Sequence, residues 1–471
     1  MIPHRRDIED LLLPVNSKGS PYNYVRLIED FSFNGEEFIR LSIKKFLEDM
    51  DLNFRFSEGR TQNYYVKATR ERTIITMFGE VTYRRTIYKD RICNKSYCYV
   101  DDKLGIEKYQ RYGNDVASYA VEAYSDENSM IKVGIELGNL IYSKFSLADN
   151  RLNAIPRQTI YRLLKKSKEV RIIPDKEKKK IETLYVLMDE KYLPGHHKID
   201  DKGNEKRSSK MTKTALVCEG LDKSDRKRHK YINPLYFSSF RSDFASDLIS
   251  FINDRYDLEA LKNVYVLADG ANWIKAVADE LKFPDTIMKQ HLCRFHLHQA
   301  LWRIFRKKET YDIAVDYVYH EDLDNLKKLF ESIEEPTETI RKNIEYINSN
   351  WDLIDNTIHL KGMNCAMEQA VSHHIHSQFD NVPKVYGDDN LNRYLSFRDG
   401  YRNRENVKCM YIEGIIDMMT NRDGEKTIIN KTRYDFSDVE ALSSLPYYST
   451  VLGSGKNTVI FKPHDDYRFI F

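Results

Sequence analysis

Two short apolar segments that each end in an aspartate carry the clearest chemistry in this sequence. They are Thr183–Asp189 (TLYVLMD) and Asn263–Asp269 (NVYVLAD). Continuous apolar character over the length of a strand predicts strands buried on both faces, as in the interior of an α/β sheet. If the strands are adjacent and parallel, Asp189 and Asp269 reach one sheet edge, where two carboxylates repel unless a cation lies between them. The pair therefore predicts a metal site, although one such aspartate alone is often a turn cap.

The segment between these two strands predicts how they are connected. Lys213–Gly220 and Asn233–Ser239 have the composition of strands, joined through the basic loop Lys223–Lys230, and Ser242–Tyr256 has the periodicity of a helix. The order strand, strand, strand, helix, strand is how a ribonuclease-H-like fold begins, with its first and fourth strands adjacent. The sequence thus predicts an α/β core with a mixed sheet flanked by helices.

A third carboxylate is expected on a later helix, and Glu368 is the best candidate. It borders an apolar stripe at helical spacing within Met363–His376. The stripe consists of Met363, Met367, Ala370 and His374. The rival acids, whose surroundings look like loops, are Asp352, Asp355 and Asp380.

A helical pattern from about Leu297 to Ser349 separates the second aspartate from Glu368. The separation is far longer than the fold needs, so we expect an all-helical insertion. A basic cluster in this insertion is a candidate DNA contact, although a solvated helix face is the more common role for such a cluster. The cluster consists of Arg303, Arg306, Lys307 and Lys308.

The segment Met130–Lys166 has the pattern of a helix-turn-helix. An apolar stripe is followed by a polar connection, and Pro156 then opens a second helix at its first turn. The stripe consists of Ile131, Ile135, Leu137, Leu140 and Ile141, and Gly134 and Gly138 weaken this first helix. In the second helix, Ile160, Leu163 and Leu164 are expected to face the core. The outward-facing residues, whose side chains could contact bases or phosphates in a DNA major groove, are Arg157, Gln158, Thr159 and Arg162. An ordinary amphipathic helix pair is an equally good interpretation.

The first hundred residues predict a small lobe with β structure. Phe38–Asp49 has a helical pattern, and Met77–Tyr88 alternates with period two as a strand does. Cys93 and Cys98 follow, but a zinc knuckle there would need two further ligands that the neighbourhood does not supply.

Composition narrows the class of protein without naming a partner. The chain has 471 residues, 41% of them apolar, which predicts several globular domains. Its 74 basic and 72 acidic residues give a net charge of +2, so any affinity for DNA must come from local clusters. No apolar run approaches the roughly 18 residues of a membrane helix, no signal peptide is recognised, and six scattered cysteines suit reduced thiols. We therefore expect a cytoplasmic protein.

These motifs resemble the transposases of the ISLre class of bacterial insertion sequences, which are related to the Mutator-like superfamily. The likeness spans roughly residues 70–400. It covers the hairpin-like Phe78–Val81 with Arg84 and Arg85, the helix-turn-helix around Arg157–Leu164, the segment Asp189–Tyr192, the strand end Ala268–Gly270, and the helix carrying Glu368. The tail after Asn403 matches no part of that family.

The resemblance implies that Asp189, Asp269 and Glu368 form a DDE triad that holds two Mg²⁺ or Mn²⁺ ions. It further implies cleavage and joining of double-stranded DNA, at the element's terminal inverted repeats and at a target, by a homo-oligomer. Mutator-like enzymes carry a Cys or Asp, two residues and a His after the second aspartate, which Cys293 and His296 match, with His291 and His298 as optional companions. Cys293 stands where relatives of this class usually carry an acid. By chemistry alone this pair is no zinc site, and the resemblance implies a structural or DNA-positioning role.

The expected organisation has six parts. They are an N-terminal helical and β-hairpin lobe at 1–104, a helix-turn-helix region at 105–172, the first part of the ribonuclease-H-like core at 173–296, a helical insertion at 297–360, the Glu-bearing part of the core at 361–403, and a C-terminal segment at 404–471. Two other functions fit the sequence. One is an inactive or domesticated transposase that acts as a DNA-binding protein, and the other is a different ribonuclease-H-like nuclease.

Overall fold

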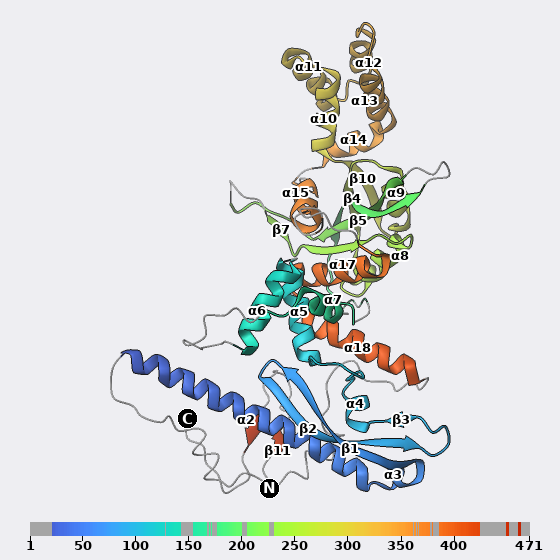
Figure 1. Cartoon of the computed structure of the whole chain (residues 1–471). Helices are drawn as coiled ribbons and strands as arrows, with labels where there is room; N and C mark the ends of the chain where they lie inside the picture. The colour runs from blue at the N-terminus through green and yellow to red at the C-terminus, as the bar shows by residue number, and fades with distance from the viewer. Residues whose placement is uncertain are drawn as a thin grey trace. The chain divides into compact units, whose positions relative to one another are not determined.

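The computed structural model forms two compact units from segments that alternate along the chain (Figure 1). Unit 1 comprises residues 1–121, 129–167 and 411–471, and unit 2 comprises residues 122–128 and 168–410. The residues described are 21–127, 129–142, 154–166, 169, 171, 177–199, 205–225, 230–360, 362–363, 365, 367–376, 379, 386–423, 449–451 and 460–462. No helix within these ranges is both long and apolar enough to cross a bilayer.

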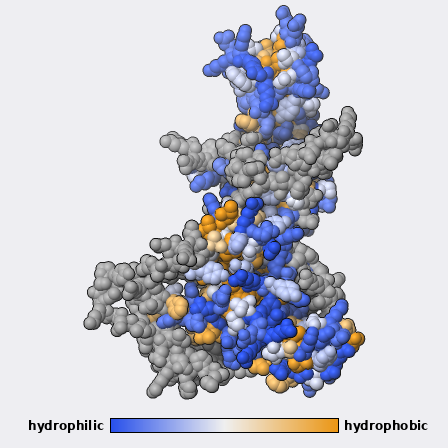
Figure 2. Space-filling view, in the orientation of Figure 1, coloured by the Kyte–Doolittle hydropathy of each residue, from blue (hydrophilic) through white to orange (hydrophobic). Residues whose placement is uncertain are grey.

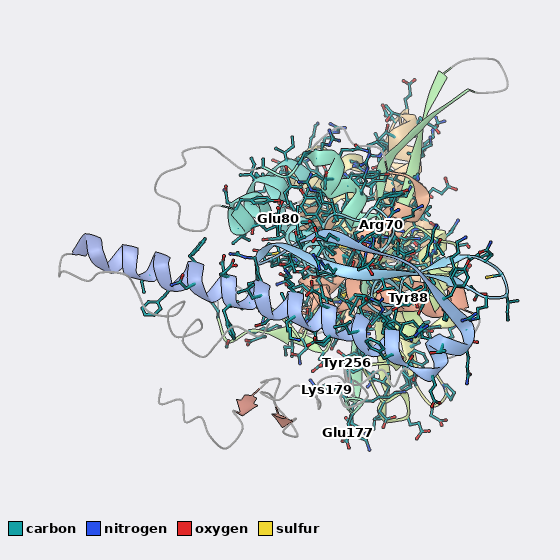
Figure 3. The ribbon with its side chains drawn as sticks, turned by 60° about the horizontal axis from the view of Figure 1, so that its bottom comes forward. Arg70, Glu80, Tyr88, Glu177, Lys179 and Tyr256 are labelled. Carbon is teal, nitrogen blue, oxygen red and sulfur yellow. The ribbon has the colours of Figure 1, made fainter. Side chains whose placement is uncertain are left out.

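Unit 1 begins with a long helix packed on a β-hairpin. Its elements are α2 (Pro21–Phe56), α3 (Glu58–Asn63), β1 (Tyr64–Thr76), β2 (Gly79–Asp90), β3 (Ser96–Tyr97) and α4 (Tyr99–Lys103). The expected strand at Met77–Tyr88 starts later, at Gly79, because Met77 and Phe78 form the turn of the hairpin. Arg40 of α2 donates to the Phe78 carbonyl over 2.8 Å and so fastens the helix to this turn. Figure 3 shows Arg70 and Tyr88 on the hairpin, with Glu80 beside its turn.

Three further helices, α5 (Asn114–Glu127), α6 (Met130–Tyr142) and α7 (Arg157–Leu164), follow the hairpin. The residues of α6 that pack inward are Val133, Leu137 and Ile141, whereas Ile131, expected in the stripe, is exposed. Pro156 is the N-cap residue, one position before the predicted helix start. Ile160, Leu163 and Leu164 of α7 are buried as expected. Residues 143–153, between α6 and α7, lie outside the described residues.

Gly134 explains why a glycine occupies the middle of α6. A Cβ atom at this position would lie 2.2 Å from the Ile155 carbonyl oxygen, and the Ile155 amide donates to the Gly134 carbonyl over 2.8 Å. The absence of a side chain therefore lets the segment that leads into α7 lie directly against α6. The close approach offsets the cost of glycine in a helix.

We predict that Gly134→Ala destabilises unit 1 by about 1–3 kcal/mol, because the new methyl group overlaps backbone that cannot yield without shifting α7. Gly35→Ala in α2 is the matched control, since nothing lies within 4 Å of a Cβ there. That change should stabilise the protein by about 0.5–1 kcal/mol. Urea unfolding measures both free energies, and equal shifts in the two variants would show that the close approach does not exist.

Unit 2 is built on a five-stranded mixed sheet in the order β10-β9-β4-β5-β8. The strands are β4 (Thr183–Ile199), β5 (Glu205–Cys218), β8 (Leu235–Ser239), β9 (Asn263–Ala268) and β10 (Ile287–Leu292). β4, β9 and β10 run parallel, and β5 pairs antiparallel with both β4 and β8. The small strands β6 (Gly220–Asp222) and β7 (Lys230–Ile232) form a separate pair.

The expectation that β4 ends at Asp189 is wrong. The strand continues to Ile199 because it pairs with β5 from Tyr185 to Ile199, with a register shift after Pro194, whereas its pairing with β9 stops at Leu187. Asp189 therefore marks the point where β4 leaves β9. The predicted adjacency of the two aspartate-bearing strands, and their parallel direction, are confirmed.

Helices cover both faces of the sheet. One face packs its alternate apolar residues against α8 (Phe244–Asn253) and α9 (Asn272–Glu280). The other face is covered by α15 (Met367–Val371), the π-helical turn η2 (Ser372–His376) and α17 (Asp388–Arg402). The short 3-10 helix η1 (Leu258–Ala260) precedes β9. Lys179, which precedes β4, forms an isolated parallel β-bridge with Tyr256, which follows α8; both residues are labelled in Figure 3.

Five helices follow β10 and extend away from the sheet (Figure 1). They are α10 (Arg294–Ile304), α11 (Lys308–Tyr319), α12 (Leu323–Glu331), α13 (Glu338–Ser349) and α14 (Trp351–His359), and they share a hydrophobic core of their own. Asp352 and Asp355, whose surroundings look like loops in the sequence, lie on α14. Asp380 is outside the described residues. The remaining elements are α18 (Val407–Asp423), β11 (Ser449–Val451) and β12 (Ile460–Lys462).

Candidate active site

Asp189 lies on β4, and Asp269 comes directly after the last residue of the adjacent parallel strand, β9. Leu187 of β4 is opposite Leu267 of β9, and each aspartate follows two positions later. Since alternate residues of a strand face opposite sides, both aspartates face away from α8 and α9, toward the face that α15 and α17 cover. Both side chains are half-buried. The structure therefore brings the two predicted carboxylates to the same edge and the same face.

Local hydrogen bonds hold each aspartate. The Glu190 amide donates to Asp189 Oδ1 over 2.8 Å, and the Ala271 amide donates to Asp269 Oδ1 over 2.9 Å. Gly270 permits the turn after Asp269, because its φ is +84° and a Cβ there would lie 2.7 Å from Asn350 Oδ1. The helical insertion also contacts this turn, since the Tyr346 hydroxyl donates to the Asp269 carbonyl over 2.6 Å.

Cys293 and His296 stand beside the two carboxylates. Cys293 follows Leu292, the last residue of β10, which is paired with Ala268, so Cys293 and Asp269 come directly after paired ends of neighbouring strands. Its amide donates to the Ala268 carbonyl over 2.7 Å. A hydrogen bond with Cys293, helped by the charges of Asp269 and Asp189, raises the pKa of His296 despite its burial. The site therefore contains an imidazole whose pKa is raised next to two acids.

The third predicted residue, Glu368, lies on α15. This helix packs against β4, and the η2 turn that follows it is bonded to β8 on the same face, because His374 Nε2 lies 3.2 Å from Ser238 Oγ. α15 thus covers the face toward which Asp189 and Asp269 point. The Glu368 side chain itself is outside the described part of the structure. The buried members of the expected stripe are Met363, Met367, Ala370 and His374.

Two residues at this edge were not recognised from the sequence. Cys365 hydrogen-bonds Cys293; that bond, its burial and the nearby charge of Asp189 raise the pKa of the Cys365 thiol. Burial also raises the pKa of Glu190, which accepts a hydrogen bond from Trp273 and lies near Asp269. The pair Asp189-Glu190 is visible in the sequence, but only the structure shows that Glu190, which faces Trp273 of α9, lies near Asp269.

His291 gives the sheet a specific sensitivity to acid. Its side chain on β10 is buried, and this burial lowers its pKa to about 4. In the unfolded chain the histidine pKa is about 6.5, so the unfolded state binds the proton more readily than the folded state. This contribution to the free energy of unfolding is therefore at its full value above pH 6.5 and decreases as the pH falls toward 4. Between pH 7 and 5 we predict a loss of about 2 kcal/mol that His291→Phe does not show. Urea unfolding at both pH values measures it, and parallel losses in the two proteins would contradict it.

The predicted DNA-contacting residues of α7 are mostly exposed. Arg157, Gln158 and Arg162 are exposed, and Thr159 is half-buried. In unit 2, the insertion exposes its basic cluster together with two aromatic side chains of α10, Phe295 and Trp302. The exposed basic residues are Arg303, Arg306, Lys307 and Lys308. Figure 2 shows a mainly hydrophilic surface over α11–α13 in that view.

Comparison with known proteins places the chain in a family. Residues 24–415 match the model of UPF0236, which is described as an uncharacterised protein family. The chain belongs to UPF0236. A UPF0236 protein of Caldanaerobacter subterraneus subsp. tengcongensis, whose name covers eleven loci, is 23% identical over 380 residues, which are 76% of this chain and 73% of the relative. A second UPF0236 protein of that bacterium, named for four loci, has the same identity and the same coverage.

Comparison with solved structures also found similar chains. One of them is a chain of the Drosophila P element transposase strand transfer complex, with 12% identity and a TM-score of 0.25. The similarity covers 72% of this chain and 88% of that chain. A TM-score this low does not establish a shared fold.

Proposed function

We propose that this UPF0236 protein is the transposase of a bacterial insertion sequence, which cuts and joins DNA through Asp189, Asp269 and Glu368. The observation that carries the proposal is the register of β4 and β9, which sets two aspartates side by side on the face that the Glu368 helix covers. A turn-capping role accounts for a single aspartate at the end of a strand. It does not account for two aspartates at matching positions of neighbouring strands together with a third acid on the helix that covers them.

The sheet order supports a ribonuclease-H-like core. In β10-β9-β4-β5-β8 the first of these strands along the chain, β4, lies next to the fourth, β9, and the second, β5, runs antiparallel to both of its neighbours. A helical insertion separates the second aspartate from the helix of Glu368. The finer assignment to the ISLre class and its DDE chemistry belongs to this proposal as well.

The donor set fits hard divalent cations. Carboxylate oxygens are the ligands that Mg²⁺ and Mn²⁺ prefer, and Asp189, Asp269 and Glu368 would hold two such ions. When bound, the ions would activate a water or a 3′-hydroxyl and stabilise the leaving oxygen. The protein's own part is to hold the carboxylates with the Glu190 and Ala271 amides, and to place the imidazole of His296, whose pKa is raised, beside them.

Double-stranded DNA is the partner we propose, at terminal inverted repeats and at target sites. The exposed Arg157, Gln158 and Arg162 of α7, with the half-buried Thr159, would contact the major groove. The basic cluster of the insertion would neutralise phosphates, and Phe295 and Trp302 would offer faces for unpaired bases. The relatives named for eleven and four loci in one bacterium support a mobile element. A homo-oligomer is expected because two element ends must meet.

The test uses the full chain, Mg²⁺ and the DNA that flanks its gene. The proposal predicts nicks at inverted repeats and products joined through a 3′-hydroxyl end. Arg157→Ala combined with Arg162→Ala should weaken binding of those repeats and reduce its dependence on salt. Cleavage without joining would indicate another ribonuclease-H-like nuclease. Binding without metal-dependent cleavage would indicate a DNA-binding protein descended from a transposase.

A further inference from the structure

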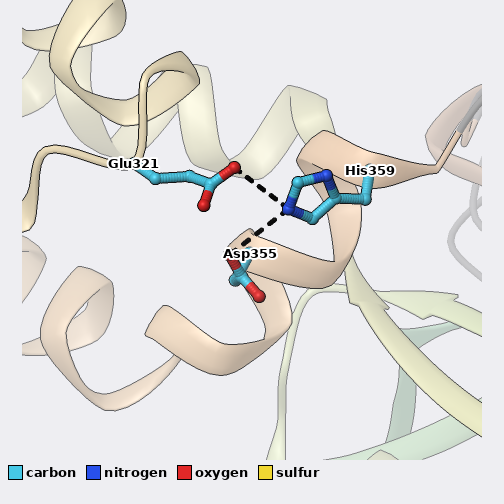
Figure 4. A group of neighbouring side chains, drawn as sticks. All are labelled: Glu321, Asp355 and His359. Carbon is cyan, nitrogen blue, oxygen red and sulfur yellow. Dashed lines mark ion pairs between the residues drawn. The ribbon is translucent and has the colours of Figure 1, made fainter.

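A second group of potential metal ligands lies on the helical insertion, apart from the candidate active site. Asp355 and His359 are four residues apart on α14 and therefore share one face of that helix. Glu321 reaches them from the turn between α11 and α12 (Figure 4). His359 Nε2 lies 3.0 Å from Glu321 Oε1 and 3.7 Å from Asp355 Oδ1. Two separate parts of the insertion thus meet at three side chains.

The spacing of these atoms matches the ligands of a metal ion. Ligands about 2.1 Å from a tetrahedral ion lie roughly 3.4 Å from one another. The two distances from His359, 3.0 and 3.7 Å, fall on either side of that value. All three ligand atoms lie within 4.8 Å of one another, and across the described side chains no other group of three His, Cys, Asp or Glu residues does so.

The chemistry of the group favours a transition metal over Mg²⁺. One imidazole and two carboxylates supply nitrogen and oxygen donors, and their two negative charges balance a divalent cation. Three protein ligands leave a position for water, which is accessible because Glu321 and His359 are exposed and Asp355 is half-buried. Elsewhere on the insertion, His320 has a single acid partner, Asp316, at 3.2 Å, which is an ordinary ion pair.

We propose that Glu321, Asp355 and His359 bind a divalent transition-metal ion of the Zn²⁺ type. The ion ties the α11–α12 turn to α14. α14 is itself fastened to β10, because Thr357 Oγ1 donates to the Leu292 carbonyl over 2.9 Å and Asn356 Nδ2 donates to the Gln290 carbonyl over 3.0 Å. The ion therefore braces the insertion against the strand that leads to Cys293. This site is independent of the proposed catalytic activity.

Titration of Zn²⁺ into the full chain, followed by calorimetry, tests the proposal. Asp189→Asn with Asp269→Asn serves as the background, so that binding at the candidate active site is removed from the comparison. In that background we expect one Zn²⁺-binding event to be lost with His359→Gln and also with Asp355→Asn. His320→Gln, the matched control, should retain it. Thermal unfolding with and without Zn²⁺ should show a stabilisation that disappears in the same two variants.

Two results would overturn the proposal. Equal Zn²⁺ stoichiometry and affinity in the background protein, His359→Gln and His320→Gln would show that the three side chains form only an ion-pair cluster. Displacement of the bound Zn²⁺ by an equal concentration of Mg²⁺ would contradict the transition-metal preference. Because the substituted side chains lie at the protein surface, circular dichroism should show unchanged helix content in every variant.

Discussion

Asp269→Asn is expected to reduce metal-dependent cleavage of terminal-repeat DNA by about 10³-fold while DNA binding stays within a factor of about two. Asparagine is nearly isosteric with aspartate, but it removes a negative metal ligand from the site. A bound metal ion lowers the activation free energy by several kcal/mol, and each step of about 1.4 kcal/mol corresponds to a tenfold change in rate. Asp189→Asn should behave alike, because its carboxylate faces the same side in the same register. The double variant should be little worse than either, since residues that act as a unit are not additive.

The matched control for these variants is Asp279→Asn. Asp279 is an exposed acid at the far end of α9, where it pairs with Lys282 over 2.7 Å. Its replacement should leave both cleavage and binding unchanged. Cleavage rates from a radiolabelled repeat, with band-shift affinities measured on the same DNA, separate the two effects. Full activity of Asp269→Asn would remove that carboxylate from the reaction.

Asp399→Ala is expected to destabilise unit 2 by about 3–5 kcal/mol, the usual cost of removing one partner from a buried charge cluster. Asp399 is 1% exposed on α17 and accepts three hydrogen bonds. The donors are Arg171 Nη1 at 2.8 Å, His374 Nε2 at 2.7 Å and the Ser238 amide at 2.7 Å. Burial alone would raise its pKa, but His374 and Arg171 together hold the pKa of Asp399 below its ordinary value. The variant removes the buried carboxylate that balances the charge of Arg171, which keeps only its bond to the Ser238 carbonyl and a longer contact with Glu169.

The same change should also disturb the candidate site, because His374 follows the helix that carries Glu368. Loss of Asp399 removes the bond between His374 of η2 and α17, so we expect proteolysis to cleave near residues 367–376 sooner than in the original protein. Asp399→Asn keeps one acceptor and should lose less stability. Asp312→Ala, at an exposed position of α11, should change the free energy of unfolding by less than about 0.5 kcal/mol. Similar values for Asp312→Ala and Asp399→Ala would show that the cluster does not stabilise unit 2.

Much of the sheet could be predicted because the local amino-acid pattern is enough to identify several of its strands. Thr183–Asp189 and Asn263–Asp269 are continuously apolar, and the structure buries them between two layers of helices. Their adjacency follows from the order of elements along the chain. The extension of β4 to Ile199 could not be predicted, because that part pairs only with β5 and has the polar composition of an exposed ribbon.

Features that depend on distant contacts left no signal in the sequence. Asp399 and His374 are 25 residues apart, and both bond Ser238 much earlier in the chain. Gly134 looks unfavourable in a helix until Ile155 is seen against it. The sequence around Asp355 predicts a loop, whereas the structure has a short helix there, α14, which begins directly after α13. Periodicity identifies an element, but it does not show which side chains of separate elements meet.

The central claim is that Asp189, Asp269 and Glu368 share bound divalent ions. A crystal structure of the full chain soaked in Mn²⁺, with the ions located by anomalous scattering, tests it most directly. We predict Mn²⁺ between the carboxylates of Asp189 and Asp269, with Glu368 among the ligands. Anomalous peaks that avoid this edge of the sheet, with the Glu368 carboxylate turned out of reach of both aspartates, would contradict the proposal.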